Sequence, residues 1–171
     1  MIDPTAPVLA VTGLARERRM AAGEGVEAVG AGGNPHRLRQ LLDARVPPGC
    51  RAVVSFGIAG GLDPSLKPGD VVVGTGVVGE DGRRAADLDL SAVLLNALSD
   101  VGPRVIPADL AGVDTAVLSV DGKTELRAAT GAAAVDMESH VAAAFAEARE
   151  LAAFATTWTG DSLPEETDDP A

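Results

Sequence analysis

Short apolar runs alternate with segments of helical pattern along this chain. The apolar runs are rich in Val and Ala and end near turn residues, which is typical of buried β-strands. The expected strands are Val8–Thr12, Val26–Val29, Ala52–Phe56, Val71–Val78, Val113–Val120 and Ala152–Trp158. Apolar residues three and four positions apart, or runs of good helix formers, predict helices between them. The expected helices begin within Ala15–Ala22 and cover Pro35–Ala44, Leu90–Leu98, Thr124–Ala129 and Met137–Leu151.

Strands that alternate with helices predict βαβ units. We therefore expect an α/β protein with a three-layer αβα architecture and a mostly parallel central sheet. Ligands of such sheets bind outside the carboxyl ends of the strands. We assign residues 1–162 to one domain. Residues 163–171 contain two prolines and four acidic residues, so we expect them to form a disordered acidic tail.

The amino-acid composition argues against several classes of binding partner and site. The chain has 14 Lys and Arg against 25 Asp and Glu, and its net charge of −11 repels nucleic acid and anionic membrane surfaces. Cys50 is the only cysteine, and the two histidines have no carboxylate or cysteine at ligand spacing, so neither a disulfide nor a metal site is expected. The chain has no run of about 18 apolar residues and no signal-peptide pattern, so we expect a cytoplasmic protein.

Three short segments contain candidates for chemistry. The glycines of Gly57–Leu62 follow a strand, and they either form a tight turn or let the backbone approach a ligand closely. Asp136 and Glu138 lie between a strand and a helix, where they either stabilise the start of the helix or project into a cleft. Asp161 follows the last strand and is either a cleft carboxylate or the first acid of the tail.

Arginines cluster after the first expected strand. Arg16 and Arg18 lie in the helical segment that begins there. If this loop borders the cleft, one of them is placed to hold a phosphate through a bidentate contact. Otherwise they are exposed helix residues.

Three segments together resemble the purine nucleoside phosphorylase and nucleosidase superfamily. Val8–Glu17 (VLAVTGLARE) is similar to its first strand and loop, and Ser55–Val73 (SFGIAGGLDPSLKPGDVVV) to its glycine loop and the following strand. Ala134–His140 (AVDMESH) is similar to its ribose-binding segment. In detail, the chain most resembles the hopanoid-associated nucleoside phosphorylases, which act on adenosylhopane. The resemblance implies the nucleoside-phosphorylase fold and assembly as a homo-oligomer.

The resemblance also implies a role for each matching residue. Met137 is expected to pack under the ribose, and Glu138 to bind the ribose hydroxyls, with Asp136 in the same segment. Asp161 matches the family's catalytic aspartate, which protonates or hydrogen-bonds purine N7. The residues expected to line the base and the phosphate or water side are Ala59, Gly60 and Gly61.

The loop after the first strand distinguishes two nucleophiles in this superfamily. Phosphorylases place a phosphate-binding arginine near the position of Arg16 and Arg18, whereas nucleosidases use a glutamate that activates water, for which Glu17 is the candidate. The arginines outnumber the acid, so we expect phosphorolysis of an adenosine-derived nucleoside, with inorganic phosphate as co-substrate and no cofactor. One alternative is a hydrolytic nucleosidase of the methylthioadenosine or adenosylhomocysteine type.

A non-catalytic, degraded homologue is the other alternative. The chain ends ten residues after Asp161, whereas relatives continue into a closing helix. We therefore expect a fold that is shortened at its C-terminus. Ile58 also replaces a hydroxyl residue that relatives use to hold phosphate or substrate.

Overall fold

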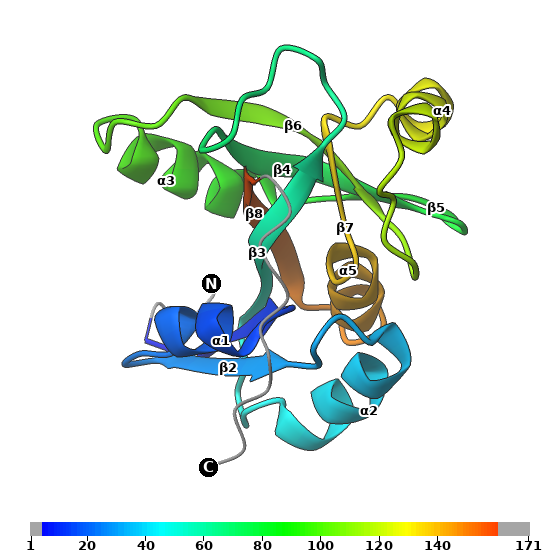
Figure 1. The fold of residues 1–171 in the computed structure, drawn as a ribbon. Coiled ribbons are helices and arrows are strands. Elements are labelled where there is room, and N and C mark those ends of the chain that lie inside the picture. The colour runs from blue at the N-terminus through cyan, green and yellow to red at the C-terminus, as the bar shows by residue number, and fades with distance from the viewer. Residues whose placement is uncertain (1–4, 161–171) are drawn as a thin grey trace.

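The computed structural model describes residues 5–160, which form an α/β fold of eight strands and five helices (Figure 1). The strands are β1 (Val8–Thr12), β2 (Val26–Gly30), β3 (Ala52–Gly61), β4 (Val71–Gly79), β5 (Gly82–Ala85), β6 (Val105–Gly112), β7 (Ala134–Asp136) and β8 (Ala152–Thr159). The helices are α1 (Ala15–Ala21), α2 (Pro35–Arg45), α3 (Leu88–Leu98), α4 (Val120–Thr130) and α5 (Ser139–Glu147). The α/β class expected from the sequence is confirmed.

The sheet is mixed and partly closed. β3 pairs with β8, β8 with β4, β4 with β6, β6 with β7, and β7 again with β3, so these five strands form a ring. β1 and β2 extend the sheet beyond β3, and β5 forms a hairpin with β4. Three of these pairs are antiparallel: β3 with β7, β4 with β5, and β4 with β8. Five of the eight pairs are parallel, so the sheet is mostly parallel as expected. It is not a plain middle layer between two layers of helices, because five of its strands close into a ring.

The length of β3 explains the closed ring. The sequence predicts a strand that ends at Phe56, before Gly57, but β3 continues to Gly61 and pairs with β1 at one end and β7 at the other. Gly57 lies within the strand, and the carboxyl group of Glu17 occupies the space where a side chain would stand. A Cβ atom placed on Gly57 would lie 2.9 Å from Glu17 Oε1. This glycine therefore permits a close side-chain approach rather than a turn.

The expected strand Val113–Val120 is also wrong. The strand of this region, β6, ends at Gly112 and contains Pro107, which does not stop it from pairing with β4. The residues after it form a loop that leads to Ser119, the N-cap of α4. The short hairpin strand β5, which is mostly exposed, has no apolar run that would predict it.

The core is built mainly from aliphatic side chains. One cluster of buried residues joins α2 and α5 to β1 and β3, and it includes Leu9, Leu38, Leu42, Val53 and Phe145. A second cluster lies inside the ring of strands around Val72 and Leu110. No helix of the described part of the chain is both long and apolar enough to span a membrane.

Candidate active site

Residues at the carboxyl ends of β1, β3, β6, β7 and β8 line one cavity of about 350 Å³. Gly13 follows β1, Ile58 lies in the second half of β3, and Gly160 follows β8. The loop after β6 and the first turn of α4 complete the wall. A ligand site at this edge of the sheet is what the strand and helix order predicts.

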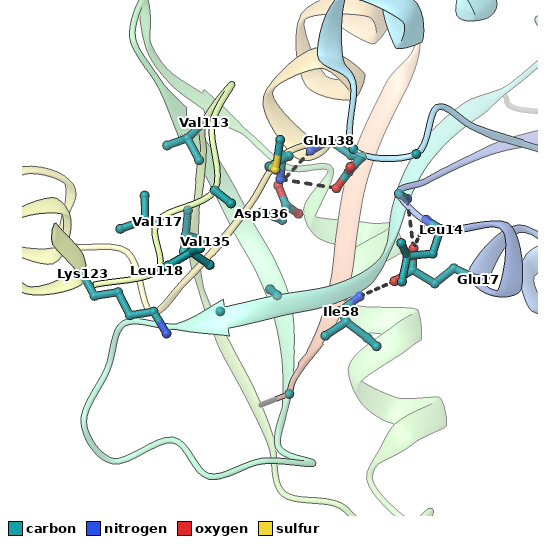
Figure 2. Close-up of a pocket in the computed structure, with 18 residues that line it drawn as sticks. Leu14, Glu17, Ile58, Val113, Val117, Leu118, Lys123, Val135, Asp136 and Glu138 are labelled. Carbon is teal, nitrogen blue, oxygen red and sulfur yellow. Dashed lines mark hydrogen bonds between the residues drawn. The ribbon is translucent and has the colours of Figure 1, made fainter. Parts of the chain in front are cut away.

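Glu17 of α1 points into this cavity (Figure 2). Its side chain accepts hydrogen bonds from the backbone N–H groups of Gly13 (2.9 Å), Leu14 (2.7 Å) and Ile58 (2.9 Å). The residue is only 5% exposed. Hydrogen bonds from N–H groups to a carboxylate are charge-assisted, and three of them fix both oxygens in one position. Glu17 is therefore a rigid carboxylate at the cavity wall.

Asp136 ends β7 and is held by the start of α5. Asp136 Oδ1 accepts hydrogen bonds from the backbone N–H of Ser139 (2.9 Å) and Glu138 (3.3 Å), and the Ser139 hydroxyl donates to Asp136 Oδ2. Ser139 Oγ also lies 2.9 Å from Ser55 Oγ of β3. Burial raises the pKa of Asp136, while the hydrogen bonds from Ser139 act in the opposite direction. Asp136 both caps the helix and lines the cavity.

Glu138 is the third carboxyl group of the cavity. Burial, together with the negative charges of Asp136 and Glu17, raises the pKa of Glu138 to about 8. Its hydrogen bond from the backbone N–H of Met137 is long, at 3.3 Å. The side chain packs closely against the backbone of β1, since a Cβ atom on Gly13 would lie 2.9 Å from Glu138 Oε1. This raised pKa favours the protonated form of Glu138 at neutral pH.

The cavity brings together most of the site residues expected from the sequence. Asp136, Met137 and Glu138 line it from β7 and the segment after that strand, and Ala59 and Gly60 line it from β3. Gly61 is not among the lining residues, because it packs against Leu66 and Thr159, whose side-chain carbons would lie 3.8 Å from a Cβ atom on it.

Arg16 and Arg18 do not join this group. Both are exposed, and neither lines the cavity, because their side chains leave α1 on faces other than that of Glu17. The structure thus brings the candidate water-activating acid, and not the candidate phosphate-binding arginines, to the cavity. Asp161 lies outside the described residues, and the residue before it, Gly160, lines the cavity.

Sequence reasoning missed three parts of the cavity wall, one of which is the pair Gly32 and Gly33 in the loop after β2. The other two come from the second half of the chain. The first is the loop after β6, from which Val113, Val117 and Leu118 reach the cavity. His140 holds this loop against α5, since its Nε2 lies 2.7 Å from Asp114 Oδ1. The second part is Lys123 of α4. No local motif marks this lysine, because it lies in a helix that has no buried residue and no apolar stripe facing a core.

The described residues contain no group of three or more His, Cys, Asp or Glu side chains arranged to hold a metal ion. The polar groups that line the cavity include three carboxyl groups, backbone N–H groups and Lys123.

The sequence matches the family model of the phosphorylase superfamily over residues 6–171. The chain therefore belongs to this superfamily, whose members are nucleoside phosphorylases and nucleosidases. No curated protein shows significant sequence similarity to it.

Solved structures share this fold at low sequence identity. The 5′-methylthioadenosine/S-adenosyl homocysteine nucleosidase of Campylobacter jejuni superposes with a TM-score of 0.77 at 13% identity, covering 96% of this chain and 90% of that one. The corresponding nucleosidase of Neisseria meningitidis, solved with methylthio-immucillin-A, gives 0.78 at 20% identity, covering 91% and 85%. Futalosine hydrolase of Helicobacter pylori gives 0.73 at 16% identity, covering 91% and 88%. The nucleoside-phosphorylase fold implied by the sequence is confirmed.

Proposed function

We propose that this protein hydrolyses the N-glycosidic bond of an adenosine-derived purine nucleoside, with water as the nucleophile. The observation that supports hydrolysis is the position of Glu17, whose buried carboxylate faces the cavity while Arg16 and Arg18 face solvent. A phosphate ion would meet acidic groups on this side of the cavity and no arginine of α1. This proposal replaces the phosphorolysis expected from the number of arginines.

The proposed reaction assigns each proton and electron pair. Glu17 accepts a proton from a water molecule whose oxygen attacks C1′ of the ribose. The C1′–N9 bond breaks, and its electron pair leaves with the purine. Asp161 is proposed to donate a proton to purine N7, as the resemblance to the superfamily implies. General acid and base groups of this kind each contribute about 10²–10⁴-fold to a rate.

The carboxyl groups suit the sugar half of such a substrate. Cleavage builds positive charge on the ribose, and fixed negative groups placed nearby stabilise that charge. Glu138 is proposed to bind the ribose hydroxyls, and Met137 to pack under the ring, in line with the resemblance. The cavity volume of about 350 Å³ lies within the range of small-molecule sites, about 300–1,000 Å³.

The substrates considered differ in the chemical group at the 5′ position of the ribose. The solved relatives include nucleosidases named for 5′-methylthioadenosine and S-adenosyl homocysteine. Similarity to them favours a substrate with a small or polar 5′ substituent. The resemblance to hopanoid-associated enzymes favours adenosylhopane, whose substituent is a large apolar lipid. Leu118, which is 81% exposed at the cavity, is placed to contact an apolar group. All three substrates present the same purine riboside to the carboxyl groups.

Adenine release measured by chromatography tests the proposal. The purified protein is incubated with adenosine, 5′-methylthioadenosine, S-adenosylhomocysteine and adenosylhopane, with and without inorganic phosphate. We expect release that does not depend on phosphate and that yields free ribose products. Strict dependence on phosphate would overturn hydrolysis, and no release from any of these nucleosides would overturn the proposed function.

A variant links the activity to the cavity. Glu17→Gln is expected to lower adenine release by about 10²–10⁴-fold, because the amide cannot accept the proton of water. Glu24→Gln is the matched control, since Glu24 is an exposed acid near the end of α1. Circular dichroism verifies that both variants are folded. Full activity of a folded Glu17→Gln protein would remove Glu17 from the mechanism.

A further inference from the structure

Lys123 is the cation among the residues that line the cavity. Its side chain reaches the end of β3 (Figure 2): a Cβ atom placed on Gly60 would lie 3.7 Å from both Lys123 Nζ and Cε. Within residues 5–160 no carboxylate lies within ion-pair distance of its ammonium group. The side chain is partly buried. An ammonium group held in a cavity beside backbone and apolar groups is placed to meet a ligand.

The helix that presents Lys123 is fixed at both ends. Ser119 caps its start, where Ser119 Oγ accepts from the backbone N–H of Gly122 at 3.1 Å. Near its other end, Arg127 Nη2 donates to Asp63 Oδ2 at 2.8 Å and Arg127 Nη1 to the carbonyl of Ala132 at 3.2 Å. The position of Lys123 is therefore set by the fold.

The cavity has two chemically different ends (Figure 2). Glu17 and Glu138 lie toward one end, whereas Lys123 lies at the other among apolar side chains. These apolar side chains are Val113, Val117, Leu118 and Val135. The segment between the two ends is short, since Val135, which packs beside Gly60, precedes Glu138 by three residues. The Cα atoms of Val135 and Glu138 are thus at most about 10 Å apart, so one nucleoside can reach both ends of the cavity.

A purine nucleoside has a matching division of charge. Its ribose becomes positive as the glycosidic bond breaks, and its base becomes negative and presents flat apolar faces with ring nitrogens at the edge. Lysine has three donors and no acceptor, so it can pair only with an acceptor atom of the base. The carboxyl end of the cavity therefore suits the sugar and the lysine end suits the base.

We propose that Lys123 binds the purine and stabilises it as a leaving group: its ammonium group donates a hydrogen bond to an acceptor atom on the edge of the base. This inference rests on the proposed function, because it names the residue that recognises the base in the same site. As the C1′–N9 bond breaks, the electron pair moves onto the purine, and the hydrogen bond from Lys123 becomes stronger. Lys123 keeps its proton throughout, so the proton that the base finally gains comes from another donor.

Leaving-group dependence tests this role. Lys123→Met removes the charge and keeps most of the length of the side chain, and Lys123→Arg keeps the charge. Lys67→Met is the control, because Lys67 is the only other lysine of the sequence and lies exposed, outside the cavity. Each variant is assayed with 5′-methylthioadenosine and with p-nitrophenyl riboside, whose p-nitrophenolate leaves without help from a donor.

We expect Lys123→Met to lower kcat/KM for the purine nucleoside by about 10²-fold and for p-nitrophenyl riboside by less than about threefold. Lys123→Arg is expected to restore most of the loss, and Lys67→Met to behave as the parent protein. An equal loss with both substrates would mean that Lys123 only supports the structure and would overturn the inference. An unchanged rate with the purine nucleoside would overturn it as well.

A binding measurement separates this inference from the proposed function. Adenine is titrated into the parent protein and into Lys123→Met by calorimetry, without any need for catalysis. If the parent cleaves no nucleoside but binds adenine about tenfold more tightly than Lys123→Met, the base site stands and the proposed hydrolysis fails. Equal affinities, or no binding to either protein, would overturn the role of Lys123.

Discussion

Replacing Glu138 by Gln is expected to change how the stability of the protein depends on pH. The pKa of Glu138 is raised from 4.5 to about 8 in the folded protein, because the carboxyl group is buried close to Asp136 and Glu17. A raised pKa means that the folded state binds the proton more tightly than the unfolded state does. The stabilisation by this proton is complete below about pH 4.5 and is lost as the pH rises through about 8. Glutamine has nearly the same shape and does not titrate.

The size of the effect follows from the same shift. One pKa unit corresponds to about 1.4 kcal/mol, so the full shift sets an upper limit of about 5 kcal/mol on the stability lost across this range. The cavity is open to water, which screens part of the repulsion, and we expect about 2–3 kcal/mol. For a protein of this size, that change corresponds to a difference of roughly 5–10 °C in Tm.

Urea and thermal unfolding at a series of pH values from 4.5 to 9 measure this difference. The free energy of unfolding of Glu138→Gln minus that of the parent is expected to rise by about 2–3 kcal/mol between pH 4.5 and pH 9. Asp136 is present in both proteins, so most of its own contribution cancels. Glu24→Gln, which changes an exposed acid, is expected to give a difference that does not vary with pH. Parallel stability curves for Glu138→Gln and the parent would refute the reasoning.

Three further substitutions test the geometry of the site. Gly13→Ala places a Cβ atom 2.9 Å from Glu138 Oε1, so the carboxyl group has to move. We expect kcat/KM for adenine release to fall by about 10-fold or more in a folded protein. An unchanged value would contradict this packing. Ser139→Ala removes a donor to the buried Asp136 and is expected to lower the free energy of unfolding by about 1–3 kcal/mol in urea titrations. Asp161→Asn is expected to lower adenine release by about 10²–10⁴-fold while calorimetry shows that substrate binding is kept; full activity would exclude Asp161 as the acid.

The parts of the site that were predictable from the sequence are contiguous in the chain. Asp136, Met137 and Glu138 follow one another, and the pair Ala59 and Gly60 is similarly local, so a short motif is enough to identify them. Lys123 comes to the cavity only because the fold brings α4 against the end of β3. A lysine in the first turns of a helix has no local pattern that distinguishes a cavity position from an exposed one.

The choice between Glu17 and its neighbours also depends on the fold. Consecutive residues of a helix point about 100° apart, so one of three adjacent positions faces the sheet, and the sequence does not say which one. The answer depends on Gly57, which lies 40 residues later and leaves room for the Glu17 carboxyl group. From the sequence alone, the same glycine is interpreted as the end of a strand. For this reason the full extent of β3, and the residue of α1 that faces the cavity, could not be predicted.

The three carboxyl groups of the cavity differ in the hydrogen-bond donors that they meet. Glu17 accepts hydrogen bonds from three backbone N–H groups, and Asp136 accepts from the hydroxyl and the N–H of Ser139. Glu138 has one long hydrogen bond, and burial together with its two acidic neighbours raises its pKa to about 8. Ribose hydroxyls would supply the donors that this group lacks, and positive charge on the sugar would favour its ionised form further. The site is thus organised so that the one carboxyl group without strong donors is the one proposed to bind the substrate.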